Sequence, residues 1–268
     1  MRSVCPHIWR WTVIAFVATV ASQAQAHQQW LAPNVFVDTR ESAWVTFDHT
    51  FGDQRFHPSS GPGSYYSWWF TGSDGLKRSI PFVFVGKTRT VGEVELEEPG
   101  TYRLEGVEDM MAWTLLKVDG EERWQPGSRE EFAGREIVRS RVYFNKAVAY
   151  VSIGSDSRTL PEATGDPLEI VFSDHPNELQ IGAGFSVRAL ASGKPLAEQE
   201  IRVYSEQGSG HDASFVCTTN ASGACRIEVS TAGRYLLATN TTIDSATHPE
   251  TDGSSYGYSV MVDVIEKD

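Results

Sequence analysis

Apolar and polar residues alternate along most of this chain, and that two-residue period favours β-strands over helices. Runs rich in β-branched and aromatic residues occur at residues 44–47, 65–70, 81–85 and 142–144. Gly, Pro, Asn and Asp separate these runs, as is typical of turns between strands. The one candidate for a helix is residues 128–136, where Ser128 could form a capping box with Glu131. We therefore expect an all-β protein.

Local signals also predict how the strands are connected. Asp119-Gly120 stands between residues 115–118 and 121–124, which indicates a hairpin with a two-residue turn. The pattern Gly-x-Tyr opens a predicted strand twice, at Gly100 and at Gly233. In sandwich domains a Tyr near the start of a strand can tie it to an upstream loop through its hydroxyl.

The repeated pattern predicts two immunoglobulin-like β-sandwich domains in tandem. We place the first at residues 27–154 and the second at residues 168–268. Residues 155–167 are rich in Ser, Asp, Pro and Gly and are the expected linker. The second domain should hold seven strands, which include residues 168–172, 185–190, 200–204 and 256–265, a strand that begins near Tyr235 and a hairpin that contains two cysteines.

Residues 1–26 have the pattern of a cleaved signal peptide. Arg2 and Arg10 precede an apolar run, which ends in Ala24-Gln25-Ala26. The apolar run is shorter than the roughly 18 residues that a membrane span needs. We expect an exported, periplasmic protein with no membrane insertion of the mature chain, which would begin at His27.

The charge balance excludes some classes of partner. The chain has a net charge of −12, which becomes −14 when Arg2 and Arg10 leave with the predicted signal peptide. An acidic surface disfavours nucleic acids and anionic membranes as partners. It favours cations, metal ions included, although the same charge would also keep an exported protein soluble.

Cys217 and Cys225 remain in the mature chain and flank turn-forming residues 220–223. A hairpin centred on that turn would place the two cysteines opposite each other. In an oxidising compartment we therefore expect a disulfide across the hairpin.

Several motifs, taken in order, resemble a family of exported bacterial proteins called domain of unknown function number 4198. They include Ala26-His27 followed by Trp30-Leu31 and Pro33, residues 99–102, residues 167–171, residues 193–197 and residues 220–223. The resemblance covers nearly the whole mature chain. It implies a periplasmic component of nickel or cobalt uptake, whose partner would be an uptake system in the envelope. The two cysteines depart from the family's pattern.

His27 is the sharpest candidate for a metal ligand. After cleavage, its ring and its free amine could chelate one ion, because the α-amine titrates near pH ~7.7–8.0. His49 and His57, in a polar segment after the predicted strand at 44–47, are the expected partners. A nitrogen-rich site of this kind suits nickel, cobalt or copper. Each histidine could instead form only local hydrogen bonds.

The remaining histidines and aromatic residues carry weaker signals. His175, His211 and His248 fall in loop sequences and could contribute a second or shared site. The aromatic run at residues 65–70 could present a sugar-binding face, but alternate strand residues point to opposite faces. No nucleophile elbow, phosphate loop or paired-His zinc helix occurs in the sequence.

The sequence thus predicts a metal-binding accessory or delivery protein rather than an enzyme. Two alternatives stay open. One is a copper-dependent oxidase that uses the same His27 centre. The other is a non-catalytic β-sandwich module that binds protein or glycan without a metal.

Overall fold

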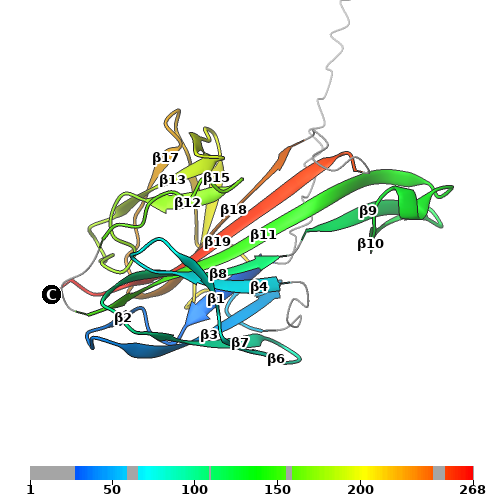
Figure 1. Cartoon of the computed structure of the whole chain (residues 1–268). Coiled ribbons are helices and arrows are strands. Elements are labelled where there is room, and N and C mark those ends of the chain that lie inside the picture. Colours follow the sequence, from blue (N-terminus) through cyan, green and yellow to red (C-terminus); the bar gives the residue numbers. More distant parts are fainter. Residues whose placement is uncertain (1–27, 59–65, 109, 155–158, 244–250, 268) are drawn as a thin grey trace, which may run out of the picture.

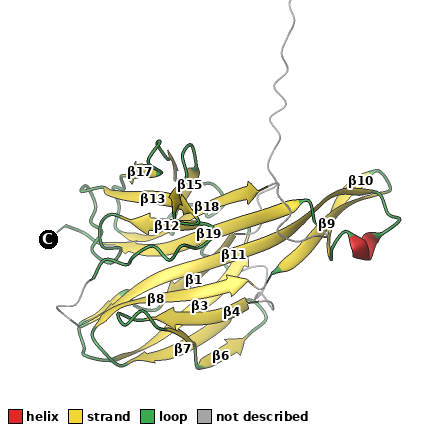
Figure 2. Cartoon of the chain, turned by 45° about the horizontal axis from the view of Figure 1, so that its top comes forward, coloured by secondary structure: helices red, strands yellow, loops and turns green. Residues whose placement is uncertain are grey.

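The computed structural model describes residues 28–58, 66–108, 110–154, 159–243 and 251–267. Nearly all regular structure in these residues is β-strand, so the all-β expectation is confirmed (Figures 1 and 2). The strands form three sheets. We call them the N-terminal, central and C-terminal sheets.

The N-terminal sheet has four antiparallel strands. In spatial order they are β1 (Gln28–Pro33), β3 (Ala43–Gly52), β7 (Thr90–Leu96) and β6 (Phe82–Val85). The strand predicted at residues 44–47 therefore continues as far as Gly52. From Ala43 to His49 its odd-numbered residues face inward, and Val45 and Phe47 are almost fully buried.

The central sheet has eleven strands from both halves of the chain. Its main path runs through β16 (Phe215–Thr218), β15 (Glu200–Ser205), β18 (Gly233–Ile243), β19 (Gly253–Val264), β11 (Ile137–Ile153), β8 (Gly100–Glu108), β4 (Tyr66–Thr71) and β5 (Lys77–Ser79). Off this path lie β2 (Val37–Asp38), β9 (Met111–Val118) and β10 (Glu121–Pro126).

The C-terminal sheet contains β12 (Glu169–Phe172), β13 (Phe185–Ala191), β14 (Lys194–Pro195) and β17 (Ala224–Ile227). It covers part of one face of the central sheet. The N-terminal sheet lies on the other face (Figure 2).

The long strand β11 belongs to both halves of the molecule. It pairs in parallel with β19 through residues 141–149 and antiparallel with β8 through residues 150–153. Its alternate side chains face opposite ways, because that is the geometry of a strand. Ala149 packs in the core beneath the N-terminal sheet, whereas Val148 packs in the core beneath the C-terminal sheet. One continuous sheet therefore passes through both predicted domains.

A third, smaller core joins the two halves directly. Trp30 and Phe36, from the start of the chain, pack against Tyr204, Leu236 and Met261. All five side chains are at most 6% exposed. The start of the first half is therefore anchored on strands of the second half.

Of two local predictions, the hairpin is confirmed and the helix is not. The hairpin of β9 and β10 turns at Asp119 and Gly120, which both have positive φ, 53° and 84°. The predicted helix at residues 128–136 is reduced to one 3₁₀ turn, Glu130–Phe132. Glu131 still accepts a hydrogen bond from the backbone N–H of Ser128 at 2.8 Å, which is half of the expected capping box.

The tyrosine ties also form. Tyr102 donates its hydroxyl to the carbonyl of Glu98 at 2.8 Å. Tyr235 donates to the carbonyl of Thr231 at 2.7 Å, so the same four-residue tie occurs in both halves.

The segment predicted as a linker is held to the central sheet by buried charges. Asp166 accepts hydrogen bonds from Lys146 at 2.6 Å and from Arg103 at 3.1 Å. Glu105 forms ion pairs with Arg103 at 3.0 Å and with Lys77 at 2.6 Å. Burial alone would raise the pKa of Glu105, but Arg103, Lys146 and Lys77 together hold that pKa below its ordinary value.

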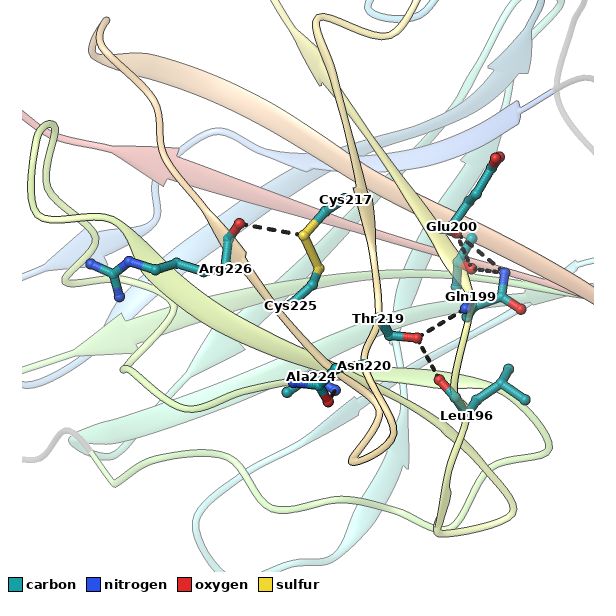
Figure 3. The surroundings of a disulfide bond; sticks show 10 residues. Leu196, Gln199, Glu200, Cys217, Thr219, Asn220, Ala224, Cys225 and Arg226 are labelled. Atoms are coloured by element: carbon teal, nitrogen blue, oxygen red, sulfur yellow. Dashed lines mark hydrogen bonds between the residues drawn. A yellow bond between two sulfur atoms is a disulfide. The ribbon is translucent and has the colours of Figure 1, made fainter.

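The cysteines form the expected disulfide, but not across a hairpin (Figure 3). Cys217 lies on β16, which pairs with β15 in the central sheet. Cys225 lies on β17, which pairs with β13 in the C-terminal sheet. The predicted turn exists, because the N–H of Gly223 donates to the carbonyl of Asn220 at 2.8 Å. The chain crosses between sheets at this turn, so the disulfide links two sheets.

Candidate functional site

The first candidate ligand, His27, lies outside the described residues. Gln28, which follows it, is the first residue of β1 and pairs with Gly52 at the end of β3. The chain therefore enters the N-terminal sheet beside the turn formed by residues 53–58. A small hollow there is lined by residues of both halves, among them Gln28, Arg55 and Tyr204.

His49 lies inside the protein on β3, not in a polar loop as the sequence had suggested. Its side chain is 1% exposed. The indole N–H of Trp68 donates to Nδ1 of His49 at 3.2 Å, and Nε2 lies 3.1 Å from Oε1 of Gln29. Burial lowers the pKa of His49 to about 3. Both ring nitrogens therefore have partners within the protein, and the ring is neutral near pH 7.

His57 is exposed and its ring is oriented by the backbone. Nδ1 lies 3.2 Å from the carbonyl oxygen of Arg55, so Nδ1 carries the proton and donates it. Metal-binding histidines are commonly oriented by such a bond from the other ring nitrogen. Among the described residues, Nε2 of His57 makes no hydrogen bond, so its lone pair is available to a ligand.

Arg55 connects this turn to a loop of the second half. Its guanidinium lies 4.5 Å from the ring centroid of Tyr204. It donates to the carbonyl oxygens of Asp53 at 2.6 Å and of His211 at 3.1 Å. The backbone N–H of Arg55 also donates to the carbonyl of Gly210 at 2.9 Å. The structure therefore brings the exposed residue His211 to the same end of the molecule as His57.

His175 is a structural residue of the seam between the halves. It is buried, its Nε2 lies 2.9 Å from the hydroxyl of Thr101, and its Nδ1 accepts the N–H of Asn177 at 3.2 Å. His248 lies outside the described residues. Of the three weaker candidates, His211 alone is placed beside the segment that follows His27.

In the part of the chain that the structure describes, no three His, Cys, Asp or Glu side chains gather around a common point. A site that includes His27 falls outside that search. Nor do the described residues contain an apolar helix long enough to span a bilayer.

Comparison with solved structures returns weak likenesses. The D0-D1 domain of intimin is 11% identical, with 87% of this chain and 96% of that chain covered and a TM-score of 0.21. The human OSCAR ligand-binding domain is 16% identical, with 85% and 96% covered and a TM-score of 0.19. Comparison with curated proteins finds no match.

The sequence itself matches one family model. The match covers residues 24–243, most of the chain, and its description is a domain of unknown function, DUF4198. This chain is a member of the DUF4198 family.

Proposed function

We propose that the protein is an exported, periplasmic metal-binding accessory protein that holds a nickel, cobalt or copper ion at its mature N-terminus. His27 would supply its amine and its ring, and His57 would supply Nε2. His211 is the further donor that the fold makes available. The partner would be a metal-uptake system in the cell envelope.

The orientation of His57 carries this proposal. Its Nδ1 donates to the carbonyl of Arg55, so the lone pair of the ring is on Nε2, which makes no hydrogen bond among the described residues. The turn that holds His57 adjoins the start of β1, where His27 precedes Gln28. His49 is not part of the proposed ligand set, because Trp68 and Gln29 occupy its two nitrogens.

The residues present fit a nitrogen-rich site. Imidazole and amine donors favour copper and nickel over the oxygen-seeking ions calcium and magnesium. The bound ion would be either the cargo that the protein carries or a Lewis-acidic centre at its surface. The chain's part is to orient the ring of His57 and to tie its turn to the loop at residues 209–211.

The test is calorimetric titration of protein that begins at His27 with Ni²⁺, Co²⁺ and Cu²⁺. We expect one-to-one binding, at least tenfold weaker when one residue is added before His27 and tenfold weaker in His57→Gln. His49→Gln, checked for folding by circular dichroism, is the matched control and should keep its affinity. Equal binding by the extended protein, or no binding at all, would overturn the proposal.

A second candidate function is favoured by the edge strand β6. Phe82 and Phe84 are 57% and 70% exposed, and Phe82 lies 5.8 Å from the exposed ring of Trp44. Among the described residues β6 pairs only with β7, so its outer edge can accept another strand. Native proteins seldom leave such an edge apolar.

Charge indicates the kind of strand. Residues 77–89 contain four basic residues and no acidic one, in a chain of net charge −12. Lys77, Arg78 and Arg89 form ion pairs with acids of this chain. Lys87, two residues after the end of β6, has no ion-pair partner among the described residues. The occupant we infer is an extended polypeptide segment of another protein with acidic flanks, added as a strand to β6.

A synthetic peptide of alternating Val and Thr flanked by Glu tests this second candidate. When the peptide binds, the amide NMR signals of residues 82–85 should shift. The affinity for the peptide should fall at least tenfold in Phe84→Ser and in Lys87→Glu. Trp124→Ser, which alters an exposed aromatic residue of β10, a strand that does not pair with β6, is the control. Absence of binding, or a dimer that Phe84→Ser abolishes, would contradict a foreign strand as the occupant.

A further inference from the structure

A cavity of about 270 Å³ lies at the seam between the two halves of the chain. One wall is residues 34–37, which lead from β1 into β2. The other is formed by β18 and β19, with Asn177 beside them. Figure 1 shows β2 and the end of β19 at the same end of the molecule, away from β9 and β10. This cavity is separate from the turn that holds His57.

Two opposite charges line the cavity without forming an ion pair. Arg234 and Asp263 are directly opposite each other on β18 and β19. No nitrogen of Arg234 lies within 4.0 Å of a carboxylate oxygen of Asp263 or of another described acid. The guanidinium of Arg234 lies instead over the ring of Phe36, 5.8 Å from its centroid. Both charges are therefore available to a bound molecule.

This arrangement differs from that of another pair of opposite charges. Arg129 and Asp252, which are also partly exposed, form an ion pair at 2.5 Å. Burial raises the pKa of Asp263, and Arg234 opposes that effect only in part. A cation placed beside Asp263 would stabilise the buried carboxylate, which Arg234 stabilises only in part.

A buried acceptor lines the same cavity. Asn177 is 5% exposed, and its Nδ2 donates to the carbonyl of Phe36 at 3.1 Å and to the hydroxyl of Ser152 at 2.9 Å. These two bonds fix the orientation of the amide. Oδ1 is then left with no hydrogen-bond donor among the described residues. A buried acceptor without a donor is unfavourable, but Oδ1 is too buried for a molecule in the cavity to contact it directly.

The rest of the lining is apolar and limits the ligand's size. Val35, Phe36 and Ile265 provide apolar surface. An apolar cavity of 150 Å³ accommodates benzene, so about 270 Å³ has room for roughly ten non-hydrogen atoms. That is the size of a single amino acid.

We infer that this cavity binds a small zwitterion of amino-acid size. Its ammonium group interacts with Asp263, and its carboxylate interacts with Arg234. Its side chain lies against Val35 and Ile265. The inference does not depend on the metal site and would stand if that site were absent.

Titration calorimetry with leucine and glutamine tests the inference. The protein is first treated with EDTA, because amino acids also chelate metal ions. We expect saturable one-to-one binding, at least tenfold weaker for N-acetyl-leucine, which lacks the ammonium, and for leucinamide, which lacks the carboxylate. Those two probes separate the roles of the two charges.

Variants then locate the site. Asp263→Asn and Arg234→Gln should each weaken leucine binding at least tenfold, whereas Glu121→Gln and Arg226→Gln, which alter charges outside the cavity, should not. Circular dichroism confirms that each variant is folded, and amide shifts at residues 34–37 provide a second readout. The inference is overturned if neither amino acid binds up to roughly 10 mM, the weak end of specific affinity. It is also overturned if leucinamide binds as well as leucine, or if both cavity variants keep full affinity.

Discussion

The indole N–H of Trp68 points at Nδ1 of His49 across 3.2 Å. Because an indole nitrogen can only donate, Nδ1 must accept, and the proton of the neutral ring resides on Nε2. That proton is donated to Gln29 at 3.1 Å. The ring is thus fixed in one tautomer inside the N-terminal half.

This contact predicts a pH dependence of stability. The pKa of His49 falls from 6.5 to about 3 on folding, so between these pH values the ring is protonated in the unfolded chain and neutral in the folded chain. The stabilisation is complete above pH 6.5 and is lost as the pH falls towards 3, with a slope of up to about 1.4 kcal/mol per pH unit. Urea unfolding at pH 7, 6, 5 and 4 should show a smaller slope in His49→Gln. His57→Gln should keep the wild-type slope, and an unchanged slope in His49→Gln would contradict the prediction.

The two tyrosine ties should contribute similarly to stability. Tyr102→Phe and Tyr235→Phe each remove one hydroxyl that donates to a backbone carbonyl four residues earlier. We expect each to lower the free energy of unfolding by about 1 kcal/mol, the net value of one hydrogen bond. Chemical denaturation measures this, with the partly exposed Tyr143→Phe as the control. A loss in only one of the two variants would show that the ties are not equivalent.

The disulfide should stabilise the protein through its short loop. Cys217 and Cys225 are separated by 8 positions, for which the chain-entropy relation gives about 2.5 kcal/mol. We expect a double Cys→Ala variant to lose about that much in urea unfolding. Reduction of the wild-type protein should produce a comparable loss, and mass spectrometry confirms the thiol state. A stability unaffected by reduction would contradict the prediction.

The buried charges around Arg103 should be far more sensitive than exposed pairs. Glu105→Gln removes the negative charge that pairs with Arg103 and Lys77. We therefore expect the free energy of unfolding to fall by roughly 3 kcal/mol. The exposed pair of Arg123 and Glu121 is the control, and Glu121→Gln should cost less than about 1 kcal/mol. Because the pKa of Glu105 is lowered on folding, its contribution is present above its ordinary pKa and is lost as the pH falls through the lowered value. Thermal melts at pH 7 and pH 4 of wild type and Glu105→Gln check both the size and the sign.

Sequence patterns predicted the features that depend on neighbouring residues. The turn at Asp119-Gly120 follows from the positive φ that both residues tolerate, and the ties of Tyr102 and Tyr235 follow from a fixed spacing. The cysteine pairing was predictable for the same reason. In each case a few residues along the chain determine the outcome.

Long-range placement was not predictable from those patterns. The turn at residues 220–223 looks the same whether its strands pair with each other or enter different sheets, and the structure shows the second. His49 resembled a loop residue because Asp48, Thr50 and Gly52 surround it, but pairing with β1 extends the strand through it. Asn177, Arg234 and Asp263 lie far apart in the sequence, and no local signal joins them. The division into two domains stays a prediction.

The shared strand β11 couples the two halves of the chain. Val148 and Ala149 are neighbours on one backbone, yet each fills a different core. A larger side chain at either position displaces the backbone of β11 and therefore disturbs the packing of both cores. Recombination that exchanged the residues after 154 for those of another protein would remove the parallel partner of β11 and leave Val148 and Tyr150 facing solvent. The second half must therefore change together with β11 during evolution, because Val148 and Tyr150 of that strand belong to the core that the second half forms.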